Sequence, residues 1–116
     1  MSKLTRTLAI VVLITCSSSA LATSFWKTGT IVRVLTDKTL YGGCMIQLSS
    51  NIGNGCPDNG WVSLDCKGIY SEPSDGKRAY VTALLAFQMG KQVSVFVNNE
   101  EKNNDYCVAR RVDIIN

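Results

Sequence analysis

The sequence predicts a mostly β domain: a five-stranded barrel with one helix between the third and fourth strands. Five short segments alternate apolar and polar residues or are dense in β-branched residues, as strands are. One segment between the third and fourth of these changes to helical spacing. Four of the five cysteines fall within residues 23–116, a number that predicts two disulfides in a small exported domain.

The amino terminus has the pattern of a signal peptide. Lys3 and Arg6 give it a positive start, and residues 8–13 are uninterruptedly apolar. Ala20 and Ala22 have the small side chains that signal peptidase requires at the −3 and −1 positions. We therefore expect cleavage after Ala22 and a secreted or periplasmic protein.

Two alternatives stay open for this segment. Its length opposes a retained membrane anchor, because a membrane span needs about 20 apolar residues. A lipoprotein would carry its lipid on Cys16, but Thr15 is larger than the residue usual before a lipidated cysteine. Cleavage leaves residues 23–116 as a single domain, and the loss of Lys3 and Arg6 lowers the net charge from +3 to +1. Neither a nucleic-acid partner nor a membrane span is expected of this domain.

The first three strands are expected in the first half of that domain. Residues 26–36 are rich in β-branched side chains, and residues 44–48 alternate strictly. Residues 61–66 alternate again after a loop at residues 49–60, which is rich in Asn, Gly and Pro. The second and third strands therefore form a hairpin.

A helix is expected over residues 77–89, with Ser74 or Asp75 as its N-cap and Gly90 as its C-terminal signal. The face expected to meet the barrel carries Tyr80, Ala83, Leu84 and Phe87. A second apolar stripe carries Val81, Leu85 and Met89. Either a curled sheet buries this stripe or it is an oligomer interface, and both interpretations stay open.

Two strands follow the helix. Residues 92–97 alternate, residues 98–105 are polar and predict a loop, and residues 106–115 predict the last strand. Three strands, a helix and two strands match the oligonucleotide/oligosaccharide-binding barrel, the OB-fold, in which closure removes most exposed strand edges.

This topology selects one pairing of the four cysteines. In the hairpin, the expected register places Cys44 opposite Cys66. The third and fifth strands of such a barrel are parallel, which brings Cys107 towards Cys56. We therefore expect the disulfides Cys44–Cys66 and Cys56–Cys107.

Catalytic chemistry is not expected. The chain has no histidine, which excludes the usual triads and imidazole bases, and neither a metal site nor a cofactor motif is present. The carboxylates of Asp37, Asp65 and Asp113 are interpreted as solvated or turn-forming groups. The basic pairs Lys77–Arg78 and Arg110–Arg111 are interpreted as solvated surface. We expect a binding protein and not an enzyme.

Three aromatic residues are candidates for ligand binding: Trp26, Tyr41 and Trp61. Each lies beside a turn, a polar loop or the expected mature amino terminus. Such rings stack on sugars or bases, or else cover the ends of a small core. The sequence leaves both interpretations open.

Two segments resemble small secreted bacterial proteins of barrel type. They are residues 54–57, Asn-Gly-Cys-Pro, and residues 80–97, which include Gly-Lys-Gln-Val-Ser-Val. These include the binding subunits of subtilase-type and pertussis-type toxins. The resemblance covers most of residues 23–116. It implies ring-shaped pentamers with helices around a central channel and glycans bound on the outer face. None of the family's sugar-contacting residues matches a position of this chain.

Two function classes follow. The first is an exported, non-enzymatic module that binds a glycan or receptor as a homo-oligomer, like a toxin binding subunit. The second is a monomeric exported protein that binds or inhibits another protein. Binding of nucleic acid ranks third, because export and a charge near zero oppose it.

Overall fold

The computed structural model describes residues 9–14 and 23–116. The predicted cleavage site after Ala22 and the alternative lipidation site at Cys16 lie outside the described residues. Residues 9–14 form neither helix nor strand. Among the described residues, no helix is long and apolar enough to cross a bilayer.

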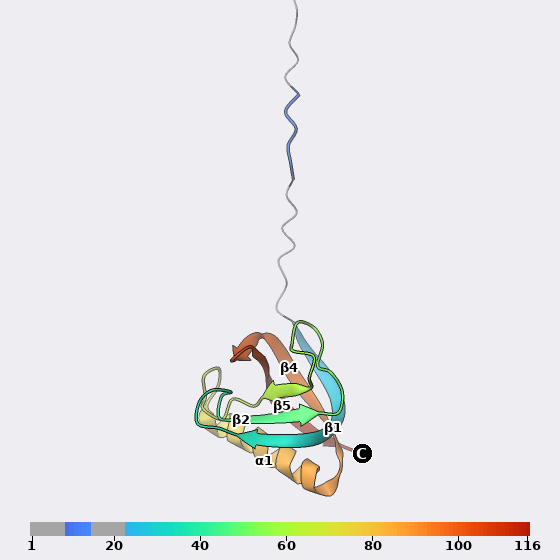
Figure 1. The fold of residues 1–116 in the computed structure, drawn as a ribbon, viewed down its shortest axis with the longest axis vertical. Coiled ribbons are helices and arrows are strands. Elements are labelled where there is room, and N and C mark those ends of the chain that lie inside the picture. The colour runs from blue at the N-terminus through green and yellow to red at the C-terminus, as the bar shows by residue number, and fades with distance from the viewer. Residues whose placement is uncertain (1–8, 15–22) are drawn as a thin grey trace, which may run out of the picture.

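Residues 23–116 form a mostly β domain of five strands and one helix (Figure 1). The elements are β1 (Ser24–Thr36), β2 (Cys44–Leu48), β3 (Trp61–Ser63), α1 (Pro73–Met89), β4 (Gln92–Asn103) and β5 (Tyr106–Ile115). The helix lies between the third and fourth strands, as the sequence predicts. In Figure 1, α1 runs along the underside of the strands.

The strand order is β1-β2-β3-β5-β4, and the pairing of β1 with β4 closes the sheet into a barrel. β1 serves two neighbours because it is 13 residues long. Its part from Ser24 to Thr30 pairs with β4, and its part from Ile31 to Thr36 pairs with β2. β3 pairs with β5 in parallel, and the other pairs are antiparallel.

The core is built from the alternating positions that the sequence indicates. Side chains of β2 and β4 that lie two residues apart are buried in one cluster, which is the period-two pattern of a half-buried strand. This cluster includes Cys44, Ile46, Leu48, Val62, Val93, Val95 and Val97. Met45 and Gln47 therefore lie on the opposite, outer face of β2.

Three strand boundaries differ from the prediction. β1 begins at Ser24, two residues before the expected start at residue 26. β3 ends at Ser63 because Asp65 has a left-handed backbone, with a φ of 58°, which turns the chain out of the sheet. β4 continues to Asn103, so the loop expected at residues 98–105 shrinks to a turn at Asn104 and Asp105. The polar residues of β4 can belong to a strand because β5 pairs with them across a bulge and one face of this part of the strand is exposed to solvent.

The helix begins earlier than expected. Pro73 occupies its first turn and Glu72 is the N-cap, so the predicted caps Ser74 and Asp75 are wrong. Proline suits this position because the first helical N–H groups have no partner within the helix. The predicted end is confirmed: Gly90 adopts the left-handed conformation, with a φ of 66°.

The core-facing side of α1 is lined by small residues. Gly76, Ala83 and Ala86 are buried, and Tyr80 is half-buried, so that burial raises the pKa of its hydroxyl. A Cβ atom at Gly76 would lie 2.5 Å from the carbonyl oxygen of Leu64, so the helix axis passes very close to the end of β3. This approach leaves little room on the core-facing side, where Tyr80 is the large α1 side chain that packs against the core cluster.

The five other large apolar residues of α1 consequently point to solvent. Leu84 is 37% exposed and Phe87 is 41% exposed, so the prediction that both face the barrel is wrong. Val81, Leu85 and Met89 are 65%, 52% and 54% exposed, so the sheet of the same chain does not bury this second stripe. We call these five residues the exposed helix face.

Both disulfides join the predicted partners, Cys44 with Cys66 and Cys56 with Cys107. The register behind the first pair is wrong by two residues. Met45 pairs with Ser63, which places Leu64 and not Cys66 opposite Cys44. Cys66 reaches Cys44, with 5.6 Å between the Cα atoms, because the chain turns at Asp65.

Candidate functional site

A small cleft lined by aromatic residues opens on the outer face of the barrel. Its volume is about 110 Å³, and its lining residues are Leu35, Tyr41, Met45, Trp61 and Tyr106. They come from β1, the β1–β2 loop, β2, β3 and the start of β5. We call this hollow the aromatic cleft. It brings together two of the three predicted binding residues, Tyr41 and Trp61.

The strand register builds the floor of the aromatic cleft. Leu35 on β1 pairs with Met45 on β2, and both lie on the outer face. Met45 is nevertheless only 2% exposed, so its neighbours in the cleft cover it. A flexible thioether fills irregular space beneath aromatic rings and makes favourable contacts with them.

The rings that line the cleft contact one another and a cation. The rings of Tyr41 and Tyr106 meet edge to face, with centroids 5.6 Å apart and an angle of 77°. The guanidinium carbon of Arg33 lies 5.3 Å from the centroid of the Trp61 ring. Gln47 separates these two residues in the sheet, since it pairs with Arg33 on one side and with Trp61 on the other.

The backbone of Tyr41 is held on two sides. The carboxylate of Asp37 accepts hydrogen bonds from the N–H groups of Tyr41, at 3.0 Å, and of Gly43, at 3.2 Å. The Ser63 hydroxyl donates to the carbonyl oxygen of Tyr41 at 2.7 Å. Ser63 in turn accepts from the buried amide of Asn103 at 2.9 Å. The β1–β2 loop is thus fixed relative to β3 and to the end of β4.

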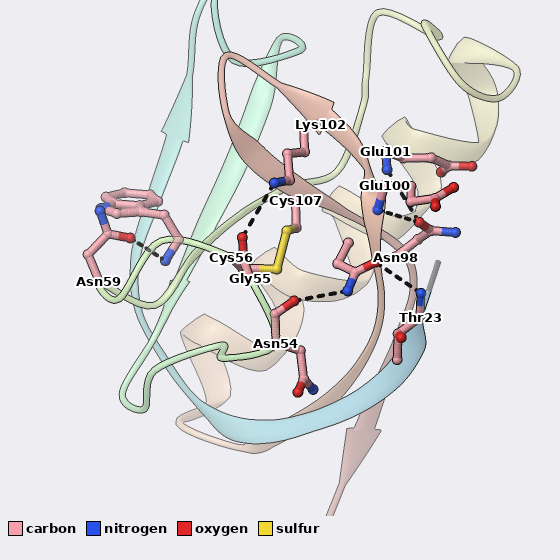
Figure 2. Close-up of a disulfide and its surroundings, with 12 residues drawn as sticks. Thr23, Asn54, Gly55, Cys56, Asn59, Asn98, Glu100, Glu101, Lys102 and Cys107 are labelled. Carbon is pink, nitrogen blue, oxygen red and sulfur yellow. Dashed lines mark hydrogen bonds between the residues drawn. A yellow bond between two sulfur atoms is a disulfide. The ribbon is translucent and has the colours of Figure 1, made fainter. Parts of the chain in front are cut away.

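The loop between β2 and β3 is tied to the other side of the cleft. The Cys56–Cys107 disulfide joins it to β5 at the residue next to Tyr106, and Figure 2 shows this bridge. Lys102 also donates to the carbonyl oxygen of Gly55 at 3.4 Å, as the figure shows. The Asn59 side chain donates to the Tyr106 hydroxyl at 3.2 Å. The loop therefore carries groups that hold Tyr106 in place.

The third predicted binding residue, Trp26, does not line the aromatic cleft. Its ring packs against Phe96 on β4, with centroids 5.0 Å apart, and Arg111 on β5 lies 5.4 Å from its centroid. The hydrogen bond from Arg111 to Asp113, at 2.8 Å, raises the pKa of the guanidinium above its usual value. The structure places Trp26, which is 48% exposed, in a separate surface cluster.

A larger hollow of about 400 Å³ lies between α1 and β5 and includes Arg78, Arg110 and Arg111 in its lining. Each of these arginines forms an ion pair: Arg78 with Asp75, Arg110 with Glu101 and Arg111 with Asp113. The positive charges are therefore balanced, and this hollow is a poor site for an anion. Arg33 has no carboxylate partner of this kind among the described residues.

Sequence reasoning missed Leu35, Met45 and Tyr106. One signal pointed to Tyr106: it precedes Cys107, whose expected bridge to Cys56 brings it to the loop that leads into Trp61. No such signal pointed to Leu35 or Met45, because the sequence does not distinguish an apolar side chain on the outer face of a strand from one in the core. Comparison with known proteins finds no matching family model, no curated relative and no matching solved structure.

Proposed function

We propose that this protein is an exported, non-enzymatic binding module whose aromatic cleft binds a glycan. The observation that carries the proposal is the convergence of Tyr41, Trp61 and Tyr106 from three separate parts of the chain. Aromatic rings stack on the apolar faces of sugars, and the polar edges of Tyr and Trp are available for the sugar's oxygens. Arg33, above the Trp61 ring, adds a donor that no carboxylate of the described residues occupies.

The position of the cleft within the fold supports this proposal. We propose that the barrel is an OB-fold, in which oligosaccharides and oligonucleotides bind over strands 2 and 3, between the β1–β2 and β4–β5 loops. Met45 and Trp61 lie on those two strands, Tyr41 lies in the first loop, and Tyr106 follows the second. A ligand in the cleft would therefore contact the face that this fold generally uses.

We also propose that the protein is a homo-oligomer that associates through Val81, Leu85 and Met89 of the exposed helix face. From residue 79 to residue 90 the chain carries no charged residue, although the outer side of α1 points to solvent. Large exposed apolar patches are uncommon on monomers. Several copies would present several clefts, which would strengthen the binding of a multivalent glycan surface. The resemblance to toxin binding subunits implies an assembly of this kind.

Export is part of the proposal because of the disulfides and the signal-like amino terminus. Disulfides persist in oxidising compartments such as the periplasm and the extracellular space. Mass spectrometry of the exported protein should show Thr23 as the first residue. An intact amino terminus beginning at Met1 in a membrane fraction would contradict the proposal, and a lipid on Cys16 would identify a lipoprotein.

A glycan array tests the proposed ligand class. The wild-type protein should bind a defined set of glycans, and Trp61→Ala should lose this binding because it removes the ring beneath Arg33. Trp26→Ala is the matched control, since it removes the same side chain from a cluster outside the cleft, and it should bind as the wild type does. Loss of binding in the Trp26 variant alone would place the site elsewhere.

The alternative is a monomer that binds or inhibits another protein. Light scattering at micromolar concentration separates the two proposals, because the oligomeric module should show a mass several times that of one chain. A monomeric wild type that gives no signal on the array would leave only the alternative.

A further inference from the structure

The side chain of Asn59 joins two residues that line the aromatic cleft. Its Oδ1 accepts a hydrogen bond from the backbone N–H of Trp61 at 3.2 Å, the bond marked at Asn59 in Figure 2. Its Nδ2 donates to the Tyr106 hydroxyl at 3.2 Å. The backbone carbonyl oxygen of Asn59 also accepts from Nε2 of Gln47 at 2.8 Å. Asn59 is therefore fixed from both the hairpin and β5.

These contacts determine which way the amide of Asn59 faces. A backbone N–H can only donate, so the side-chain oxygen must be the atom that faces Trp61. The NH₂ group then faces Tyr106, and the phenol oxygen of Tyr106 must accept. The phenol has one proton of its own, and no group among the described residues accepts it. Tyr106 consequently keeps a free donor at the aromatic cleft.

We propose that Asn59 is a positioning residue that makes Tyr106 a hydrogen-bond donor to the ligand in the aromatic cleft. The inference rests on the glycan-binding function proposed above. A phenol that already accepts one hydrogen bond is polarised and donates more strongly. The ligand must then present an acceptor oxygen, such as a carbonyl, an ether or a hydroxyl oxygen, beside the ring that stacks on Trp61. Asn59 itself acts through Tyr106 and does not line the cleft.

Asn59→Asp reverses this arrangement with almost no change of shape. One carboxylate oxygen still accepts from the Trp61 N–H, so the turn is preserved. The other oxygen replaces the NH₂ group and can only accept, so the Tyr106 proton turns towards residue 59. The phenol then presents its lone pairs to the ligand in place of its proton. Asn51→Asp is the matched control, because it adds the same charge at an exposed residue of the same loop.

A spectroscopic measurement reads this reversal without any ligand. In Raman spectra, the ratio of the tyrosine ring doublet distinguishes a hydroxyl that accepts from one that donates. The contribution of Tyr106 is isolated by subtracting the spectrum of Tyr106→Phe, measured in each background. In Asn59→Asp the ratio should change from the value typical of an accepting hydroxyl to that of a donating hydroxyl. In Asn51→Asp it should stay unchanged. An unchanged ratio in Asn59→Asp would overturn the inference.

A double-mutant cycle then tests the role in binding, with the glycan that binds best on the array as the probe in calorimetry. Asn59→Asp should weaken binding by about five- to tenfold, the worth of one neutral hydrogen bond. Tyr106→Phe should weaken binding by a similar factor. Adding Asn59→Asp to Tyr106→Phe should cost little more, because the hydroxyl through which Asn59 acts is already gone.

The outcomes separate this inference from the proposed function. An equal loss from Asn59→Asp in both backgrounds would show that its charge acts directly, which overturns the inference while glycan binding stands. A wild type that binds no glycan overturns the proposed function and, with it, the role of Tyr106 as a ligand donor. The Raman ratio would in that case still decide whether Asn59 orients the hydroxyl.

Discussion

The side-chain amide of Asn103 donates a hydrogen bond to the carboxylate of Asp65 at 3.0 Å, and both side chains are buried. The same amide donates to the Ser63 hydroxyl, and the backbone N–H groups of Ile69 and Tyr70 donate to Asp65 at 3.1 and 2.8 Å. In the described part of the chain, every buried side-chain nitrogen and oxygen has a partner. Removal of the Asn103 amide therefore takes one hydrogen bond from each of two buried groups, which keep their other partners.

Asn103→Ala should lower the free energy of unfolding by about 1 to 3 kcal/mol, because it removes one hydrogen bond to a buried carboxylate and one to a buried hydroxyl. Urea denaturation measures the change. Asn51→Ala, at an exposed residue, should change the free energy of unfolding by no more than about 0.5 kcal/mol. If the two variants were equally stable, the network would be shown to contribute nothing to folding.

Gly76→Ala should destabilise the protein, although the same exchange within most helices stabilises by up to about 1 kcal/mol. The added Cβ would lie 2.5 Å from the carbonyl oxygen of Leu64 and 2.6 Å from that of Asp65, and both are backbone atoms that cannot rotate away. We expect a loss of about 1 to 3 kcal/mol in thermal or urea denaturation. Gln88→Ala, on the exposed side of α1, is the control, and a Gly76→Ala variant as stable as the wild type would contradict the close approach.

The two disulfides should contribute unequally to stability. Cys56 and Cys107 are separated by 51 residues, whereas Cys44 and Cys66 are separated by 22. The cost of closing a loop in the unfolded chain grows with the logarithm of its length, which favours the longer bridge by about 0.7 kcal/mol. Replacement of each pair by alanine, compared in urea denaturation, measures the difference. A larger loss for the Cys44–Cys66 pair would mean that native packing outweighs loop closure.

Residues on opposite sides of α1 should respond differently to a charge. Ala83 is fully buried, so Ala83→Asp should prevent folding, because an unpaired buried carboxylate is strongly unfavourable. Leu85→Asp should leave a folded domain that circular dichroism recognises, since Leu85 is 52% exposed. In light scattering the same variant should be a monomer under conditions in which the wild type is an oligomer. A monomeric wild type would refute the proposed interface.

Local patterns in the sequence predicted the elements with few errors. The alternation of β2, the boundaries of β5 and the helix end at Gly90 all follow from near neighbours in the chain. The missed N-cap at Glu72 is a local error, but the errors in β4 and at Leu84 lie where a distant partner decides. β4 extends through polar residues that have no strand pattern of their own, because β5 supplies their pairing. Leu84 looks like a core residue on a helical wheel, yet the close approach at Gly76 turns it outwards.

By itself, the sequence determined the kinds of element, their order and the lack of histidine chemistry, because periodicity and residue type act over a few residues. The two disulfide pairs were predicted correctly only by assuming the barrel topology, with a register that is wrong by two residues for Cys44 and Cys66. Only the tertiary structure decided that Tyr41 and Trp61 share a cleft with Tyr106 while Trp26 lies apart. Closure of the barrel determines which strands have neighbouring outer faces. No local sequence pattern encodes this arrangement of the strands. The same closure places Asn59 between Trp61 and Tyr106, and so determines the direction of the Tyr106 hydrogen bond.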